Sequence, residues 1–468
     1  MRFIGKDPNI IDAYYTATAE GAITAGKPVI VEADGDVTQV SSVSASAGTS
    51  TVFHDASTGS IDVVYDSAAQ KIVIFYRDIA NSSYGTAQVG TVSGTSISFG
   101  TAVVFESAVA SNLGATFDSN AGKTVVAYTS GSSSGKAVVG TVSGTSISFG
   151  TAATFESANT QETAIVFDSD ENKIVIAYKD LGNSNQGTAI VGTVSGTSIS
   201  FGSASVFHSG TTTSIGATYD TTASKVVIGY RDSSNTGDAI VADVSGTTLT
   251  YGTAVQFTAN NAIDTKVTHD STAGKNVFVF RDLTETDGKA VVGTVTASDN
   301  SISFGTVQTF KDNAIDDPVV IYDSASNNVV ILYEDTSGTT KLSFLMATLS
   351  GTTLTLGSTI DIVSELAETP RIAYDANAVK HVAVYSASAD SDKGKYAVLT
   401  NASTNLTSEN YIGIAEYAAA DTETATVLIK GGVSTTQSSL TPGQTYFVQT
   451  DGTIGTTAAS PSVTAGTA

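Results

Sequence analysis

The stretch that decides the fold is VGTVSGTSISFGTA, residues 89–102. The same string recurs at 139–152, and its first twelve residues recur at 191–202. Each copy alternates apolar and polar residues on both sides of a Ser-Gly turn, which predicts a β-hairpin. Looser copies begin at Val241, Val292 and Met346. A repeat at a fixed period indicates an architecture built from identical structural units.

A second marker, a large residue followed by Asp, accompanies each repeat. Seven such aspartates occur, 50 to 53 residues apart: Asp66, Asp118, Asp168, Asp220, Asp270, Asp323 and Asp375. They follow one strand pattern and precede another, as in SIDVVYD (60–66) and KIVIFY (71–76). Because an Asp side chain bonds nearby backbone N–H groups, the repeated position predicts a hairpin turn.

Each unit contains four strand patterns and no helical period, so the sequence predicts an all-β protein. Four strands every ~50 residues are typical of a β-propeller blade, and seven copies predict seven blades around a central channel. The last unit lacks a segment like the one that follows the earlier units. We therefore expect residues near 49–53 to supply part of the outer strand of the seventh blade and to lock the ring.

The two ends of the chain lie outside the repeat and resemble each other. Residues 23–35 align with residues 440–452, and both contain a turn, a strand and an Asp-Gly turn of the hairpin type. Further strands are predicted at 411–418 and 424–432. The expected organisation is a small β-barrel or sandwich made by residues 1–45 and 408–468, with the seven-bladed propeller of residues 46–407 inserted into it.

Composition excludes several function classes. The chain has 468 residues, with 22 Lys and Arg against 45 Asp and Glu, a formal net charge of −23. It has no Cys, so disulfides and thiolate sites are excluded, and a basic footprint for nucleic acid is not expected. No run reaches the length of a membrane span, and the N-terminus lacks the pattern of a signal peptide. We expect neither nucleic acid nor a membrane as partner.

The repeat resembles one found in virion proteins of tailed phages, marine ones in particular. The resemblance rests on VGTVSGTSISFGTAVVFESA and on the pattern YDSxxxKIVIAYRD. The C-terminal stretch that begins YIGIAEYAAADTETATVLIKGG is similar to a small β module of phage appendage and tail-fibre-like proteins. The resemblance implies a structural component of the particle and therefore a location in the virion.

Residue patterns for catalysis and metal binding are absent. A sialidase-like propeller would carry Asp-box turns that end in Trp, and this chain has no Trp. The four histidines show no ligand spacing, and His54 and His208 follow an outer strand, where we expect exposed surface. The loop 168–172 lacks the Gly and Glu of an EF-hand. We expect no enzyme activity, no catalytic residue, no cofactor and no metal.

The candidate recognition residues end the second strand of five units. A propeller places them at the channel mouth, where a ring of charge can bind a sugar or an ion; the alternative is that they pair between blades or face solvent. The copies Thr129-Ser130 and Ser386-Ala387 interrupt the ring. The candidates are Arg77, Asp78, Lys179, Asp180, Arg231, Asp232, Arg281, Asp282, Glu334 and Asp335.

The sequence thus favours an outward-facing appendage or fibre component. Its terminal module would dock on other virion proteins, capsid or tail, and its propeller would contact host surface polysaccharide. A homo-oligomer is compatible with this arrangement. Two alternatives stay open: a capsid decoration protein that coats or stabilises the head, and a polysaccharide depolymerase.

Overall fold

The chain divides into two compact units. The computed structural model describes residues 13–131, 133–429, 432–459 and 461–468. One unit is residues 46–400, and the other combines residues 1–45 with 401–468, so the predicted boundary at 407 lies at 400. The first twelve residues, and residues 430–431 of the strand predicted at 424–432, lie outside the described residues.

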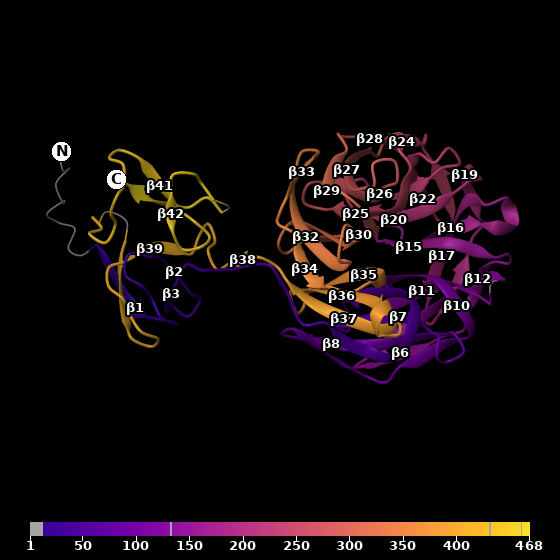
Figure 1. Cartoon of the computed structure of the whole chain (residues 1–468), viewed down its shortest axis with the longest axis horizontal. Helices are drawn as coiled ribbons and strands as arrows, with labels where there is room; N and C mark the ends of the chain where they lie inside the picture. Colours follow the sequence, from indigo (N-terminus) through magenta and orange to yellow (C-terminus); the bar gives the residue numbers. More distant parts are fainter. Residues whose placement is uncertain (1–12, 132, 430–431, 460) are drawn as a thin grey trace. The chain divides into compact units, whose positions relative to one another are not determined.

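The larger unit is a β-propeller, which confirms the predicted fold class. Figure 1 shows the sheets following one another around a ring in chain order. Within this unit the described residues form seven blades, each with three long antiparallel strands; four blades are separate sheets, and the seventh, first and second blades are joined into one sheet of 13 strands. The first strands, which lie innermost and contact one another around the ring, are β6 (Thr51–Asp66), β10 (Val103–Asp118), β15 (Thr160–Asp168), β20 (Thr213–Asp220), β25 (Ala262–Asp270), β30 (Ile315–Asp323) and β35 (Ala367–Asp375).

The second and third strands of each blade extend outward from the first. The second strands are β7 (Lys71–Asp78), β11 (Lys123–Ser130), β16 (Lys173–Asp180), β21 (Lys225–Arg231), β26 (Lys275–Asp282), β31 (Asn328–Asp335) and β36 (Lys380–Ala387). The third strands are β8 (Tyr84–Ser93), β12 (Ser134–Ser143), β17 (Gln186–Ser195), β22 (Gly237–Ser245), β27 (Asp287–Thr296), β32 (Lys341–Ser350) and β37 (Lys393–Thr400).

The outer strand of each blade consists of two segments that pair with different halves of the third strand. The first segments are β9 (Ser96–Phe99), β13 (Ser146–Phe149), β18 (Ser198–Phe201), β23 (Thr248–Tyr251), β28 (Ser301–Phe304) and β33 (Thr353–Leu356). The second segments are the start of β10, β14 (Ala153–Glu156), β19 (Ser205–Thr211), β24 (Val255–Thr258), β29 (Gln308–Lys311) and β34 (Ile360–Val363).

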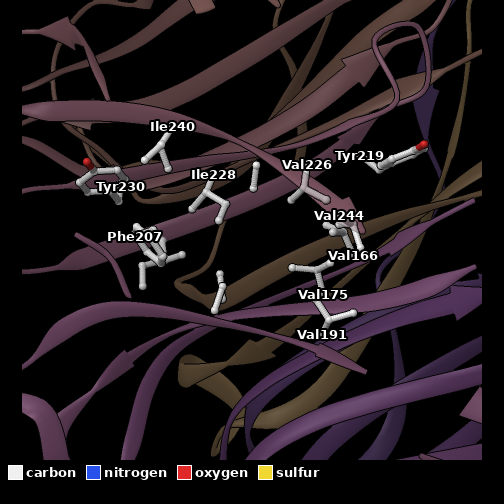
Figure 2. Close-up of a cluster of buried hydrophobic side chains, with 14 residues drawn as sticks. Val166, Val175, Val191, Phe207, Tyr219, Val226, Ile228, Tyr230, Ile240 and Val244 are labelled. Atoms are coloured by element: carbon white, nitrogen blue, oxygen red, sulfur yellow. The ribbon is translucent and has the colours of Figure 1, made fainter. Parts of the chain in front are cut away.

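The hydrophobic core lies between neighbouring blades. Figure 2 shows one interface, in which Val175 and Val191 of the third blade pack with Val226 and Ile228 of the fourth. Similar clusters fill the other interfaces between adjacent blades. Complete burial of one such Val or Ile side chain stabilises the fold by about 1.5–3 kcal/mol. The β-branched second strands, apolar on both faces, therefore hold the ring together.

The ring is closed by the segment that enters it. The short strand β5 (Ser46–Ala47) and residues 51–57 of β6 pair with β37, with Ala47 opposite Leu399 and Val52 opposite Lys395. This pairing completes the seventh blade before β6 becomes the first strand of the first blade. The predicted closure by residues near 49–53 is confirmed.

The seven repeated aspartates are hairpin devices, as predicted. Each is 0 to 2% exposed and accepts at least one hydrogen bond from a backbone N–H of the turn after the first strand. For example, the Asp66 Oδ1 atom accepts from the Ala69 N–H at 2.8 Å, and the Asp375 Oδ1 atom accepts from the Asn377 N–H at 3.0 Å. These carboxylates are therefore committed to the fold.

The terminal unit contains strands from both ends of the chain. Its five-stranded sheet has the order β1-β40-β39-β2-β3, a three-stranded sheet has the order β42-β41-β43, and β4 pairs with β38. Ile30 and Val448 share one buried cluster, which joins the two larger sheets. The strand pairings close no barrel within the described residues. The bounds are β1 (Tyr14–Thr18), β2 (Pro28–Val31), β3 (Val37–Gln39), β4 (Ser42–Val43), β38 (Ser403–Thr404), β39 (Tyr411–Ala415), β40 (Thr424–Leu428), β41 (Thr445–Val448), β42 (Ile454–Gly455) and β43 (Thr464–Thr467).

The similarity between the two ends extends to their turns. The Gly35 N–H donates to the Glu32 carbonyl and the Gly452 N–H to the Gln449 carbonyl, both at 3.1 Å. Helix is confined, in the described part of the chain, to two short 3₁₀ segments, η1 (Leu181–Asn183) and η2 (Ser388–Asp390). No described helix has the length and hydropathy of a membrane-spanning segment.

Candidate functional site

Each first strand begins with a β-bulge that puts one residue in the left-handed backbone conformation. In the first blade, Gly59 pairs with Arg77 and Asp62 with Phe75, so three steps along β6 match two along β7. The same shift occurs at the equivalent place in the other six blades. We call the left-handed residues the axial ring; their φ values lie between 43° and 55°, and they are Ser60, Asn112, Glu162, Ser214, Asp264, Asp317 and Thr369.

Every member of the axial ring is polar and none is glycine. A left-handed conformation costs an L-residue about 1–2 kcal/mol, and glycine avoids that cost. Two of these side chains bond to the next blade: Asn112 Nδ2 donates to Thr160 O at 3.4 Å, and Ser214 Oγ accepts from the Asp264 N–H at 3.0 Å. The residue type differs between blades while the backbone is the same, which is the arrangement expected of a recognition surface on a rigid scaffold.

The charged members of the ring act on one another across the propeller axis. Burial raises the pKa of Asp264 to about 6, and the negative charges of Asp317 and Glu162 add to the rise. Glu162 belongs to the third blade and Asp264 to the fifth. Since two innermost strands that are not neighbours meet only across the axis, these side chains face it.

A second layer of charge lies two residues further along the same strands. Asp62, Lys266 and Arg371 occupy equivalent positions, opposite Phe75, Val279 and Val384 of their second strands. Burial raises the pKa of Asp62, against the opposing influence of Arg371 and of the Ala115 N–H. Burial also lowers the pKa of Lys266, and Arg371 lowers it further. Clusters of perturbed ionisable groups mark candidate functional sites.

The predicted aspartates are engaged in local structure. Asp180 Oδ1 accepts from the Gly182 N–H at 2.9 Å, and Asp232 Oδ1 accepts from the Ser234 N–H at 2.8 Å. The same carboxylate oxygen of Asp78, Asp282 and Asp335 accepts from the N–H groups of Asn81, Thr284 and Ser337. All five carboxylates therefore organise the turn after the second strand.

The residues that precede these aspartates mostly bond to the next blade. Arg231 Nε donates to Asn261 Oδ1 at 2.8 Å, Arg281 forms an ion pair with Asp316, and Glu334 Oε1 accepts from the Ala367 N–H at 2.9 Å. The side chains of Arg77 and Lys179 make no hydrogen bond or ion pair with the described residues. The alternative of pairing between blades thus applies to three of the five. A recognition role for the ten candidate residues stays a prediction.

The expectation that His54 and His208 lie on exposed surface is wrong. Both are half-buried: the His54 Nδ1 and Nε2 atoms lie 3.4 Å from Tyr76 Oη and 3.2 Å from Asp78 Oδ1. The His208 ring packs against Tyr230 with a centroid distance of 5.1 Å. Over the described ranges, no group of three His, Asp or Glu side chains has the geometry to hold a metal ion.

Six of the seven axial residues, all but Ser60, lie in the polar segments that vary most between units. The sequence predicts these segments as surface loops that either serve recognition or are merely tolerated turns: 107–114, 157–163, 209–216, 258–264, 311–317 and 363–369. Each member of the axial ring lies six positions before a marker aspartate, as Ser60 lies before Asp66. Aligning the seven units on that aspartate and looking for a column that varies among polar residues would have found the ring. When the residue is not glycine, the sequence does not indicate that its backbone is left-handed.

No protein-family model matches the sequence, and neither does any curated protein sequence. Among solved structures, a lectin of Aleuria aurantia in complex with Fucα1-6GlcNAc matches over 67% of this chain and 98% of its own, at 13% identity and a TM-score of 0.41. An intramolecular trans-sialidase of Ruminococcus gnavus matches over 75% and 97%, at 9% identity and a TM-score of 0.45. The NanB sialidase of Streptococcus pneumoniae matches over 76% and 70%, at 10% identity and a TM-score of 0.44.

These comparisons overturn the expectation that the chain is not an enzyme. Sialidases and trans-sialidases occur among the matched structures together with lectins. At identities of 7–13% and TM-scores of 0.41–0.45, the matches concern the fold and indicate no substrate or reaction for this chain.

Proposed function

We propose that this chain is a virion protein of a tailed phage, and that its propeller binds glycans of the host surface around the axis. The observation that carries the binding function is the axial ring of seven polar side chains held in a strained conformation. Carboxylate, amide and hydroxyl groups on a rigid scaffold suit the hydroxyl groups of a sugar. The division into two compact units supports a role for the terminal unit in docking to other virion proteins.

Glycan binding can be tested by removing the charges of the axial ring. The triple variant Glu162→Gln, Asp264→Asn and Asp317→Asn keeps the shapes of the side chains, and we expect its affinity for host polysaccharide to change at least tenfold. A matched triple variant, Asp170→Asn, Glu171→Gln and Asp243→Asn, removes the same charge near the other end of the strands and should bind normally. Biolayer interferometry on immobilised host polysaccharide compares them. Equal binding by wild type and both variants would contradict the proposal.

An electron-microscopy map of the particle tests the location. A small number of copies at the tail supports the appendage role. Copies that follow the symmetry of the head would instead identify a capsid decoration protein.

A second candidate function, cleavage of the bound polysaccharide, is favoured by one observation. Glycoside hydrolysis uses two carboxyl groups, one of which holds its proton near neutral pH. Burial raises the pKa of Asp264 to about 6 and the negative charge of Asp317 adds to the rise, so these two carboxyl groups are the candidates for such a pair. Release of reducing ends by wild type and not by Asp264→Asn would support cleavage; binding without release would support a lectin function.

A further inference from the structure

Two cations near the propeller axis lack the partners that enclosed cations usually have. Lys266 and Arg371 are half-buried and lie at one level of the inner strands, four positions before the marker aspartates. Three of the other blades carry a glycine or alanine at this level, Gly114, Ala164 and Gly216. A Cβ atom on Gly114 would lie 3.2 Å from Thr163 O, and one on Gly216 would lie 2.7 Å from Thr265 O, so neighbouring first strands pack closely at this level.

Lys266 has almost no hydrogen bonding. Its ammonium group makes one bond among the described residues, to its neighbour's carbonyl oxygen, Thr265 O, at 3.4 Å. Within the same residues no carboxylate lies within 4.0 Å of it, although Asp264, Glu162 and Asp317 lie near enough to influence its pKa. An ammonium group has three donors, so two are left for a ligand or solvent.

Arg371 is also incompletely bonded. Its Nη1 atom donates to Pro370 O at 2.8 Å, and its Nε atom lies 4.0 Å from Asp62 Oδ1. The Asp62 carboxylate also accepts from the Ala115 N–H at 2.7 Å and from the Val63 N–H at 2.9 Å. A guanidinium group has five donors in a planar fork, and most of those of Arg371 remain available.

Enclosing two cations is costly, because each loses hydration and repels the other, and here the one ion pair that they form within the described residues is the long contact between Arg371 and Asp62 at 4.0 Å. The mutual effect is visible in Lys266, whose pKa is lowered by burial and by Arg371 in spite of the nearby carboxylates. An anion placed between the two cations would supply the missing hydrogen bonds and cancel the repulsion.

We infer that Lys266 and Arg371 form an anion-binding site for an acidic sugar, with the axial ring binding its hydroxyl groups. This inference rests on the proposed glycan-binding function and names the class of glycan. A carboxylate of a uronic acid or a sulfate ester offers the required oxygen pair to the arginine fork. The carboxylates of Glu162, Asp264 and Asp317 can accept hydrogen bonds from neighbouring hydroxyl groups.

The site also has an expected pH dependence. Asp62, Glu162, Asp264 and Asp317 carry negative charge around the two cations. Protonation of Asp264, whose pKa is about 6, removes one of these charges as the pH falls. Affinity for an acidic glycan should therefore increase between pH 8 and pH 5, whereas affinity for a neutral glycan of the same shape should change much less.

The test uses the full chain and three glycan probes: oligogalacturonate, its neutral methyl ester and sulfated dextran. We expect Lys266→Gln and Arg371→Gln each to weaken oligogalacturonate binding at least tenfold and to leave the methyl ester unaffected. Lys393→Gln, which removes a half-buried cation of the seventh blade that pairs with Asp55 and Asp390, is the control and should bind like wild type. The sulfated probe shows whether the site takes sulfate as well as carboxylate. Equal binding of acid and ester, or unchanged binding by the variants, would overturn the inference.

Thermal unfolding in the presence of small anions tests the anion site independently of the proposed glycan-binding function. Galacturonate and sulfate should raise the thermal unfolding temperature of wild type and not that of Lys266→Gln. If they do so while no glycan binds, the anion site stands and the glycan function fails. If glycans bind without any dependence on the two cations, the function stands and the anion site fails. Circular dichroism of each variant confirms that it is folded.

Discussion

Single residues around the axis combine a strained backbone with a polar side chain. Thr369 is the extreme case, because a β-branched residue has φ of 49° and its hydroxyl has no hydrogen-bond partner among the described residues. Replacing it by glycine removes the strain but increases the flexibility of the unfolded chain. The balance between the strain removed and the flexibility added shows whether Thr369 is retained for stability or for binding.

We expect Thr369→Gly to raise the free energy of unfolding by roughly 0.5–1 kcal/mol. Thr268→Gly is the control, since Thr268 lies in the regular part of β25, where glycine only adds flexibility and should destabilise. Urea unfolding measures both. A loss of stability in Thr369→Gly similar to that in Thr268→Gly would show that the left-handed conformation carries no cost here.

Glu334 makes stability depend on pH. Burial raises the pKa of this side chain to about 7, from an unfolded value near 4.5, and the carboxylates of Asp316, Asp317 and Glu368 add to the rise. Because the folded state holds the proton more tightly, its contribution to stability is full below pH 4.5 and is lost as the pH rises through 7. Stability should therefore fall between pH 5 and pH 8.

In Glu334→Gln this part of the pH dependence should disappear, and the variant should exceed wild type in stability at pH 8. The amide oxygen can still accept the hydrogen bond from Ala367 N. Asp312→Asn, which removes an exposed carboxylate, should retain the wild-type slope. Urea unfolding at pH 5 and pH 8 tests this, and parallel slopes for wild type and Glu334→Gln would refute it.

At the scale of the element, one contact recurs between the third strand and the outer strand. A Cβ atom on Gly135 would lie 2.5 Å from the ring of Phe155, and Gly85, Gly187, Gly237, Gly288 and Gly394 have the same relation to a phenylalanine. The sixth blade has Leu342 in place of the glycine and Ile362 in place of the phenylalanine. The two positions thus change together within one chain.

Gly135→Ala should destabilise the chain by about 1–3 kcal/mol, because the added methyl group overpacks the blade. Adding Phe155→Ile should recover part of the loss, so that the double variant is more stable than the sum of the single effects predicts. Gly338→Ala is the control: a Cβ there meets nothing within 4 Å, and stability should change by less than about 0.5 kcal/mol. Strict additivity would argue against the coupling.

Strand elements could be predicted from the sequence where alternation and turn residues coincide. The strand predicted from KIVIAYKD is β16, and the marker aspartates accept hydrogen bonds from the backbone of the predicted turns. The segment 107–114 was interpreted as a variable loop, whereas β10 runs without interruption from Val103 to Asp118. A strand that contains a bulge and belongs to two blades in turn can carry polar residues, and polarity alone does not distinguish such a strand from a loop. Residue types do not indicate a bulge, so the left-handed conformation of the axial residues was not predicted.

At the scale of the molecule, the repeat count and the closing segment were both predictable, because each blade needs four strands and the last unit lacks one. All strands of the ring, including β5 and the start of β6, lie within residues 46–400. The terminal unit takes β1, β2 and β3 from one end and β39 and β40 from the other. Truncation at either end of the chain therefore removes strands of the terminal unit, whereas residues 46–400 keep every strand of the propeller.

A fragment of residues 46–400 should fold cooperatively, with a thermal unfolding temperature within a few degrees of the propeller transition in the full chain. A fragment that starts at residue 58 should not, because it lacks the strands that complete the seventh blade. Scanning calorimetry compares the two fragments with the full chain. Aggregation of the 46–400 fragment, or equal stability of both fragments, would show that closure does not depend on this segment.

The closing pair also determines how mechanical load enters the ring. Ser46 and Thr400, the first and last residues of the propeller, are partners in one antiparallel ladder. Tension between a ligand held by the propeller and an anchor held by the terminal unit pulls both residues in the same direction. It is shared by two adjacent strands and does not peel one from the other. In the proposed role, the pairing of β5 with β37, which closes the ring, would thus be shielded from the force that an attached particle transmits.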